Sequence, residues 1–399
     1  MDPKRLQKYS NVTRTTRKDF INIHPIQAAG KLTPEAKKAL EEFGDGYSIC
    51  DMCLEGRLDM INKPPIHEFL EDMAIFLGMD DVRPTAGSRM AMNIIFKVIA
   101  NPGDIVVIDS LAHYTTYLAA EDNKVKVTEV PHNGHPQFKL NLEAYAKKIE
   151  DVKAKTGKLP PFVVLTHVDY NYGNVNAIKI VAKICKDYNV PLVVNGAYSV
   201  GVMPIKGKEV GADFLIGSGH KSMAASGPIG VIGTTSEWVK KIFSTSTIKG
   251  DWSSRQFLQK EYHFYGCPPV YGAPIATLMA SFPRVVERTK PENWDEEIKK
   301  IRYFVTEMER IEDVKALGIR PKQHTLTQFE TPSLYKASLK HKQKGYYLYK
   351  ALKKNKVAGI FPGSSKHFKL NTYGLTWDEI KKVAGVFQKI AEENSIKIN

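Results

Sequence analysis

The sequence predicts an α/β fold in which helices cover both faces of a mostly parallel β-sheet, followed by a small α+β domain. From about residue 64, short apolar runs rich in β-branched residues alternate with segments of helical periodicity. Such alternation is typical of parallel sheets that are covered by helices. After about residue 283 the pattern changes to long amphipathic helices, and 399 residues are enough for two hydrophobic cores.

The elements of the larger part follow a regular order. A helix is expected in KPPIHEFLEDMAIFLG, which has prolines at its start and a glycine just past its end. RPTAGSRMAMNIIFKVIA is expected to be a turn that opens a helix. Further helices are expected in YTTYLAAEDN and IKIVAKICKDYN, and strands in DIVVIDS, KVKVTEVP, FVVLTHVDY, PLVVNGAYS, DFLIGSGH and GPIGVIG. Sheets of this kind bind ligands beyond the carboxyl ends of their strands.

The carboxyl-terminal part has a different character. Helices are expected in PENWDEEIKKIRYFVTEMERI and TWDEIKKVAGVFQKIAEEN, with TLTQFETP and a lysine-rich segment between them. The polar and aromatic stretch STSTIKGDWSSRQFLQKEYHFYGCPPVYGAP precedes this part and is expected to be an exposed functional loop. We therefore divide the chain into a basic amino-terminal arm (1–20), a large domain (21–283) and a small domain (284–399).

Composition limits the location and the partners. The arm lacks the apolar stretch of a secretory signal, and no run of about 18 or more apolar residues exists to span a membrane. We expect a cytoplasmic protein. The net charge of +14, from 57 Lys+Arg against 43 Asp+Glu, favours a polyanionic partner. A generally lysine-rich composition would explain the charge equally well, since no single dense basic block stands out.

Four polar motifs stand at the ends of predicted strands, namely TAGSRM, DSLAHYTT, VVNGAYS and SGHKS. The first, at the start of a helix, offers backbone N–H groups to a phosphate. His113 is placed to stack on a planar ring, and Asn195 to touch the far edge of that ring. Ser218 and His220 flank Lys221 with groups that can bind phosphate. A lysine with a lowered pKa forms Schiff bases with carbonyl cofactors. The alternative for Lys221 alone is a solvated loop lysine, but the ordered set favours the cofactor.

From about residue 20 onward this set resembles the fold-type I pyridoxal-phosphate (PLP) enzymes. Within that class the sequence is similar to the Sep-tRNA:Cys-tRNA synthase family, which converts O-phosphoseryl-tRNA(Cys) to cysteinyl-tRNA(Cys). The segments that carry the similarity are INIHPIQAAGKLTPEA, CDMC, RPTAGSRMAM, THVDYNYGN, VVNGAYSVG, GSGHKSMAASGPIGV and HFYGCPP. The resemblance implies a seven-stranded sheet, PLP as cofactor, a homodimer, tRNA(Cys) carrying O-phosphoserine as substrate, and a complex with the phosphoseryl-tRNA synthetase.

The resemblance also implies roles for individual residues. Lys221 would hold PLP covalently and act as general base, and His113 would stack on the ring. Asn171, or Asn174 in its place, would bond the 3-oxygen of the ring, and Gly272 would reach the phosphate from the neighbouring subunit. The full cofactor-binding set would be Gly87, Ser88, Arg89, His113, Asn171, Asn195, Ser218, Gly219, His220, Lys221 and Gly272. Arg89 and Arg255 are candidates for the substrate phosphate, because a guanidinium group matches phosphate geometry.

Asn195 departs from the wider class, in which an aspartate keeps the pyridine nitrogen protonated. A neutral asparagine holds that proton less firmly, so we expect a weaker electron sink. Phosphate is a good leaving group, and its β-elimination does not require a long-lived carbanion. We therefore expect this site to favour elimination over transamination.

Three of the four cysteines, Cys50, Cys53 and Cys267, match the functional cysteines of the family. One interpretation is that a thiolate carries sulfur as a persulfide. The other is that the three cysteines ligate an iron–sulfur cluster and leave one iron open to bind sulfide. The sequence does not decide between them. Cys185 lies in a helical pattern and is expected to be a small buried hydrophobe.

The sequence is compatible with two other functions. One is that of a cysteine desulfurase, which has the same fold and transfers sulfur in the opposite direction, although the CDMC pair and Asn195 favour the synthase. A non-catalytic RNA-binding protein with a structural iron–sulfur site would also fit the charge and the cysteines, and it would bind no PLP.

Overall fold

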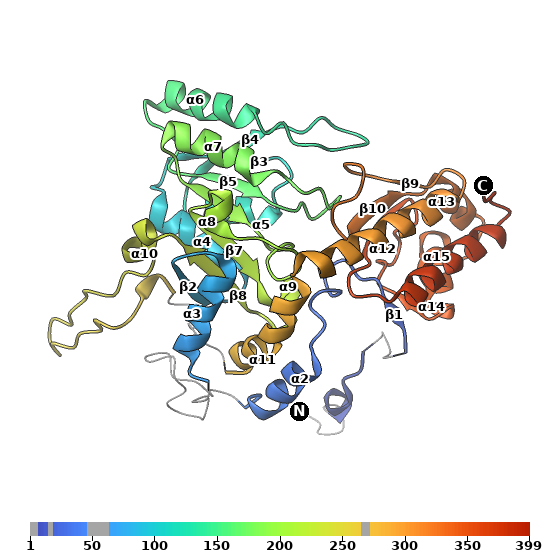
Figure 1. The fold of residues 1–399 in the computed structure, drawn as a ribbon, viewed down its shortest axis with the longest axis horizontal. Coiled ribbons are helices and arrows are strands. Elements are labelled where there is room, and N and C mark those ends of the chain that lie inside the picture. Colours follow the sequence, from blue (N-terminus) through green and yellow to red (C-terminus); the bar gives the residue numbers. More distant parts are fainter. Residues whose placement is uncertain (1–6, 15–18, 46–63, 265–271) are drawn as a thin grey trace.

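The computed structural model describes residues 7–14, 19–45, 64–264 and 272–399. Figure 1 shows a large α/β part beside a smaller part that contains the carboxyl terminus. The α/β class with a mostly parallel sheet, which the alternating pattern predicts, is confirmed. In the part of the chain that the structure describes, no helix is both long enough and apolar enough to cross a membrane.

The large part is built on a seven-stranded sheet with the strand order β2-β8-β7-β6-β5-β3-β4. Neighbouring strands from β4 to β7 run parallel, whereas β8 is antiparallel to both β7 and β2. Every residue of β3, β5, β6, β7 and β8 is buried, as expected for strands covered on both faces. The strands are β2 (Asp81–Thr85), β3 (Ile105–Asp109), β4 (Lys126–Val130), β5 (Val163–Thr166), β6 (Leu192–Asn195), β7 (Phe214–Ser218) and β8 (Gly230–Thr234).

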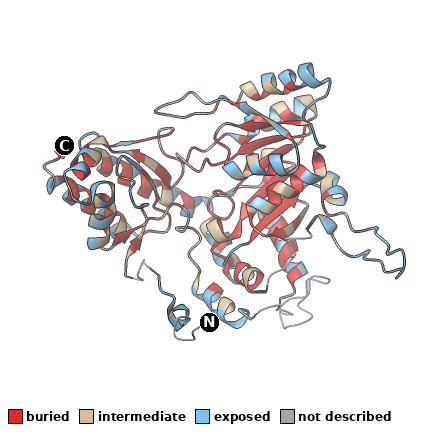
Figure 2. Ribbon diagram, turned by 180° about the vertical axis from the view of Figure 1, so that it is seen from behind, coloured by how far each residue is buried: buried red, intermediate tan, exposed pale blue. Residues whose placement is uncertain are grey.

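Two sets of helices cover the two faces of this sheet, and Figure 2 shows buried strands between helices whose outer sides are exposed. Adjacent strand residues such as Val106 and Val107 belong to different hydrophobic clusters, because successive side chains of a strand point to opposite faces. One face is covered by α3 (Ile66–Leu77), α6 (Ala144–Thr156), α7 (Ile178–Tyr188) and α11 (Gly272–Arg288), and the other by α4 (Ser88–Ile99), α5 (Tyr114–Asp122) and α10 (Ser236–Ile242).

Shorter elements complete the large part. Helix α3 begins after Pro65 and ends at Gly78, whose φ of 61° is in the left-handed region, as its sequence predicts. The remaining helices here are α2 (Pro34–Glu42), α8 (Gly207–Val210) and α9 (Gly219–Ser222), with 3₁₀ turns at Gln7–Asn11 and Tyr262–Phe264. Of the stretch expected to be an exposed loop, the described part that follows α10 extends from the body of the protein (Figure 1), and Trp252 on it is 93% exposed, whereas Phe264 is buried.

The smaller part packs helices against a three-stranded antiparallel sheet of order β12-β10-β9. Its core contains the aromatic side chains of Phe304, Phe329 and Phe387. Its elements are α12 (Pro291–Glu309), β9 (Lys315–Ala316), β10 (Leu326–Glu330), α13 (Pro332–Leu339), η3 (Lys344–Tyr346), α14 (Tyr347–Lys354), β11 (Val357–Ala358), β12 (His367–Asn371) and α15 (Trp377–Glu392).

The amino-terminal segment belongs to this second core. Strand β1 (Ile21–Asn22) pairs in parallel with β11, and Ile21 and Ile23 pack in the cluster formed by the carboxyl-terminal helices. Helix α11 also runs past residue 283 to Arg288. The predicted boundaries of the large and small domains stay a prediction.

Candidate active site

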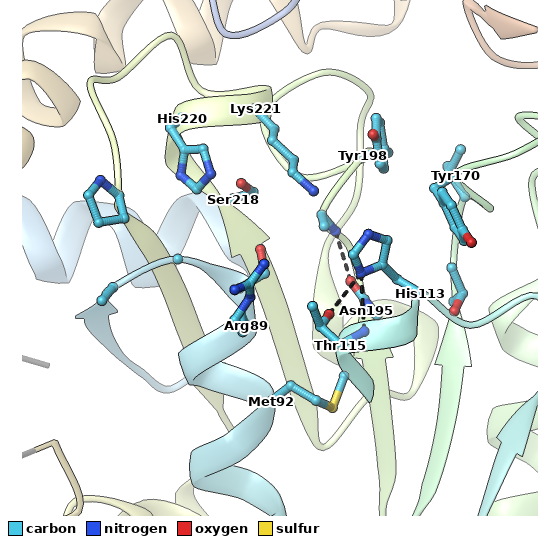
Figure 3. Close-up of a pocket in the computed structure, with 17 residues that line it drawn as sticks. Arg89, Met92, His113, Thr115, Tyr170, Asn195, Tyr198, Ser218, His220 and Lys221 are labelled. Atoms are coloured by element: carbon cyan, nitrogen blue, oxygen red, sulfur yellow. Dashed lines mark hydrogen bonds between the residues drawn. The ribbon is translucent and has the colours of Figure 1, made fainter. Parts of the chain in front are cut away.

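A cavity of about 430 Å³ lies at the carboxyl ends of the parallel strands, where the sequence places the four polar motifs. It brings together eight of the predicted site residues, namely Gly87, Ser88, Arg89, His113, Asn195, Ser218, His220 and Lys221. These residues follow β2, β3, β6 and β7, so the order of the strands assembles motifs that are far apart in the sequence (Figure 3).

Lys221 extends from the short helix α9 into this cavity, beside Tyr198 and His113 (Figure 3). Its Nζ lies 5.2 Å from the centre of the Tyr198 ring. Burial lowers the pKa of Lys221, and the positive charge of Arg89 lowers it further. A lowered pKa increases the fraction of uncharged amine, which is the nucleophilic form.

The turn between β2 and α4 forms one wall of the cavity. Gly87 has a φ of 88°, and a Cβ atom there would come within 3.2 Å of the His220 ring. Ser88 begins α4, and its Oγ donates to the carbonyl oxygen of Gly217 at 3.1 Å. Ser218 Oγ is buried and has no hydrogen-bond partner within the described residues. A helix start beside a free hydroxyl is suited to an anion such as phosphate.

His220 and Gly219 differ in what they offer to a ligand. Nδ1 of His220 lies 2.9 Å from the carbonyl oxygen of Ile229, which fixes the ring at the cavity wall. The N–H of Gly219 already donates to that carbonyl at 2.9 Å, and a Cβ atom on Gly219 would lie 2.6 Å from a methyl group of Ile229. Gly219 does not line the cavity, and its expected role in cofactor binding stays a prediction.

His113 caps the amino terminus of α5, since its side chain accepts from the N–H of Thr115. The ring lies 4.8 Å from Tyr170 in an edge-on arrangement. Burial, together with the charges of Lys221, Lys369 and Arg89, lowers the pKa of His113 to about 4. At neutral pH the imidazole is therefore uncharged, which suits stacking on an aromatic ring.

Asn195 ends β6 and is almost fully buried at the floor of the cavity. Its Oδ1 accepts from the N–H of Ala197 at 3.2 Å, so the amide NH₂ is the group left to bind a ligand. Thr166, at the end of the neighbouring β5, has a buried Oγ1 without a partner among the described residues.

The structure separates some predicted residues from the cavity. Asn171 does not line it. Asn174 donates from Nδ2 to the carbonyl oxygens of residues 137 and 138, and its Oδ1 accepts from the N–H of Ile319, so its amide is committed to loop packing. Arg255 lies on the exposed loop, with its guanidinium over Phe257. Gly272 begins α11 and does not line the cavity formed by this chain.

Several cavity residues were missed by the sequence reasoning. Thr166 and Tyr170 lie in the quoted segment THVDYNYGN, and Tyr198 lies in NGAYS, so their position at strand ends was an available signal. Lys369 does not line the cavity but contacts Tyr170, which does, and it carried no such signal. It comes from β12 of the smaller part, donates to the carbonyl oxygen of Tyr170 at 2.9 Å, and lies 4.6 Å from that ring.

Of the four cysteines, the structure describes one. Cys50, Cys53 and Cys267 lie outside the described residues. In the described ranges no group of three or more His, Cys, Asp or Glu side chains could hold a metal ion. Cys185 is buried as expected, and burial raises its pKa to about 12, so it is not a thiolate at neutral pH.

Comparison with known proteins agrees with this arrangement. A family model described as O-phosphoseryl-tRNA(Sec) selenium transferase, SepSecS, matches residues 97–392. O-phospho-L-seryl-tRNA:Cys-tRNA synthase 2 of Archaeoglobus fulgidus is 51% identical over 383 residues, which are 96% of each chain. The synthase of Methanopyrus kandleri is 48% identical over 99% of this chain and 100% of its own.

Solved structures agree as well. A SepCysS–SepCysE N-terminal domain complex matches with a TM-score of 0.88 and 46% identity, over 98% of this chain and 99% of that one. A cysteine desulfurase of Thermococcus onnurineus matches with a TM-score of 0.71 and 20% identity, over 93% of this chain and 95% of that one, which shows a shared fold. The architecture is that of fold-type I enzymes. The chain belongs to the O-phospho-L-seryl-tRNA:Cys-tRNA synthase family, within the wider group that the SepSecS model describes.

Proposed function

We propose that the chain converts O-phospho-L-seryl-tRNA(Cys) and a sulfur donor into L-cysteinyl-tRNA(Cys) and phosphate, with PLP bound to Lys221. The observation that carries the proposal is Lys221 itself, a lysine with a lowered pKa in a cavity lined by a helix start, two serines and a neutral histidine. The close relatives are named for this reaction, which supports the same substrate here.

The residues present fit PLP. Ser88, Ser218 and His220 would bind its phosphate, since Ser218 Oγ is buried without a partner in the described residues. His113, uncharged at neutral pH, would stack on the ring, and the Asn195 NH₂ would donate to a ring nitrogen that carries no proton. When bound, PLP supplies an electron sink that stabilises negative charge at the α-carbon of an amino acid.

Lys221 and Arg89 would act on the substrate. The uncharged Nζ of Lys221, once free, accepts the α-proton of the phosphoseryl group as a general base. Arg89 is exposed at the cavity mouth, and its Nη2 donates to the Tyr114 hydroxyl at 3.2 Å. We propose that its remaining N–H groups bind the substrate phosphate and stabilise it as it leaves.

Sulfur would reach the β-carbon through Cys50, Cys53 and Cys267 in one of two ways. In the first, a persulfide on one of these cysteines adds to the β-carbon, a second cysteine forms a disulfide with the first as the cysteinyl thiol is released, and an external thiol reductant restores the pair. In the second, an iron–sulfur cluster that the three cysteines hold supplies sulfide, which adds without a change of oxidation state. The buried thiol of Cys185, with its pKa of about 12, is unsuited to this step, which supports the other three. An anaerobic visible spectrum of wild type and of Cys53→Ser separates the two, because only a cluster gives absorbance that the substitution removes.

Borohydride reduction followed by peptide mapping tests the proposal. The cofactor is expected on the peptide that contains Lys221, and Lys221→Ala should lose the visible absorbance of the Schiff base and at least about 10³-fold in activity. An unmodified Lys221 would overturn the mechanism. Release of sulfide or persulfide from free cysteine, without phosphoseryl-tRNA, would instead identify a desulfurase.

The assembly follows from the same proposal. We propose a cytoplasmic homodimer in which Gly272 reaches the cofactor phosphate of the neighbouring subunit, and a complex with the synthetase that makes phosphoseryl-tRNA. A solved relative is a complex with SepCysE, so a third protein of that kind is a further candidate partner. Light scattering and co-purification with the synthetase test these assemblies.

A further inference from the structure

One segment of the smaller part carries most of the excess positive charge of the chain. Residues 331–377 contain ten lysines and no aspartate, glutamate or arginine. Among these lysines, the side chains of Lys336, Lys340, Lys342, Lys344 and Lys350 are exposed. These lysines are spread over the sequence, but α13, η3 and α14, which carry most of them, pack against one another.

A groove of about 430 Å³ lies on this segment, between α14 and the end of α15. We call it the lysine groove, and define it by the lysines that line it, Lys342, Lys350, Lys354 and Lys389. It shares no lining residue with the Lys221 cavity. Any ligand of the groove therefore contacts a surface that is separate from the reacting groups.

Most of the positive charge of the lysine groove has no partner of opposite charge in the described part of the chain. Glu393 also lines the groove and lies 4.0 Å from Lys389. For Lys342, Lys350 and Lys354 the described part of the chain provides no ion pair. Neighbouring lysines without counter-charges repel one another, and a row of phosphates relieves that repulsion and releases bound counterions.

Aromatic rings form one wall of the groove. The rings of His341 and Tyr347 are stacked, 3.6 Å apart and nearly parallel. Asn394 holds both, because its Oδ1 lies 2.7 Å from Nε2 of His341 and its Nδ2 lies 2.7 Å from the Tyr347 hydroxyl. Tyr346 beside them is 55% exposed. Lysines interleaved with rigid or exposed rings are typical of nucleic-acid surfaces, which offer both phosphates and bases.

We propose that the lysine groove docks the phosphate backbone of the tRNA, an inference that rests on the proposed function because it takes tRNA as the substrate. The groove contributes binding energy far from the reaction, so it lowers KM without changing kcat. The carboxylates of an acidic protein would also bind the lysines, but an acidic protein would leave the stacked rings of His341 and Tyr347 without a ligand group to contact. RNA supplies both phosphates and bases, so RNA is the partner that fits this surface.

The test compares three full-length variants for binding of an unacylated tRNA(Cys) transcript at several salt concentrations. Replacing Lys342, Lys350 and Lys354 with glutamine should weaken binding about tenfold or more and reduce the slope of log Kd against log salt by about two to three. Replacing the same three with arginine should keep both. Replacing Lys153, Lys155 and Lys158, which are exposed at the end of α6, with glutamine removes equal charge and should change little.

The outcomes separate the two proposals. If the glutamine variant of the groove binds tRNA as tightly as wild type, or as tightly as the α6 control, the docking surface is overturned, while conversion by wild type leaves the function standing. If the glutamine variant of the groove binds tRNA as tightly as wild type but no longer binds poly-L-glutamate, the groove is a site for an acidic protein instead. A wild-type protein that neither binds nor converts charged tRNA(Cys) would overturn the function itself.

Discussion

At the scale of single residues, the cavity chemistry depends on how charges are arranged around Lys221. Arg89 and Lys369 surround the cavity with positive charge, and both lower the pKa of His113. The site thus combines a neutral imidazole with an amine whose pKa is lowered. An anionic ligand fits this environment because it restores the balance of charge.

The pKa of Lys221 can be tested through the rate at which apoprotein binds PLP. Because only the uncharged amine reacts, the rate should rise with pH and level off below the ordinary lysine pKa of 10.5. Arg89→Met should move the midpoint to higher pH, since it removes a neighbouring positive charge that favours the uncharged form. Arg255→Met, which alters a distant exposed arginine, serves as control, and an unmoved midpoint in Arg89→Met would contradict the assignment.

Asn195 should set the balance between elimination and transamination. Asn195→Asp places a carboxylate where the amide NH₂ now lies, which favours a protonated ring nitrogen and a stronger electron sink. We expect more conversion of the cofactor to its amine form per turnover, measured by product analysis of single-turnover reactions. If both the elimination rate and this by-product stay at the wild-type level, the neutral amide has no such role.

At the scale of elements, the loop after β5 joins the two parts of the molecule at the cavity. The carboxylate of Asp169 accepts from the N–H groups of Asn171, Tyr172 and Asn174, which shapes the loop. Gly173 in this loop faces the carbonyl oxygen of Leu326 in β10, and a Cβ atom there would lie 2.0 Å from it. The position of the loop that carries Tyr170 therefore depends on close contact with the smaller part.

Gly173→Ala should destabilise the protein by about 2–4 kcal/mol, from an unfavourable positive φ and a backbone collision together. Gly134→Ala is the matched control. Gly134 has a φ of 79°, close to the 67° of Gly173, but no atom lies within 4 Å of the added Cβ. Gly134→Ala therefore loses only the stability that the unfavourable positive φ costs, which is about 1 kcal/mol. Urea unfolding measures the free energy of unfolding of both variants. Equal losses of stability would show that the contact between Gly173 and Leu326 does not contribute.

The elements that could be predicted from sequence are those with a clear period. The buried strands β3, β5, β6 and β7 are runs of apolar residues that end in polar motifs, and they carried the site prediction with them. The motif TAGSRM was placed at a strand end, but the residues of strand β2 (DVRPT) were assigned in part to a turn, because β2 is a short edge strand with a proline. Helix α11 was missed because its first residues, Gly272, Ala273 and Pro274, read as the end of the preceding loop, and because Pro283 interrupts its pattern.

Contacts between distant segments had no local signal. The hydrogen bonds that commit the N–H of Gly219 to Ile229 and the Oδ1 of Asn174 to Ile319 could not be read from the neighbouring sequence. The arrival of Lys369 at Tyr170 has the same cause, since β12 reaches the cavity only through tertiary packing.

At the scale of the whole molecule, Arg288 contacts four segments that are far apart in the sequence. Its Nε donates to the carbonyl oxygen of Gly201 at 2.7 Å, and its Nη2 donates to those of Ser222 and Ala29. The guanidinium also lies 5.3 Å from the ring of Tyr373 in the smaller part. The amino-terminal segment, the turn that carries Lys221 and the smaller part thus meet at one side chain.

Arg288→Met should lower the free energy of unfolding by about 2–4 kcal/mol, because it leaves enclosed carbonyl groups without a donor. Arg284→Met, one turn earlier on α11, removes an exposed ion pair with Glu35 and should change stability little. Differential scanning calorimetry compares the two. An Arg288 variant as stable as the Arg284 variant would show that the carbonyls find other donors.

The pairing of β1 with β11 has a consequence for synthesis on the ribosome. Ile21 is made 336 residues before its partner Val357 (357 − 21 = 336). Domains generally fold as their chain emerges, but β1 stays unpaired until the segment that contains β11 has left the ribosome. The nascent chain therefore keeps Ile21 and Ile23 without their native cluster while the sheet of the large part is made, and their burial has to follow the synthesis of the smaller part.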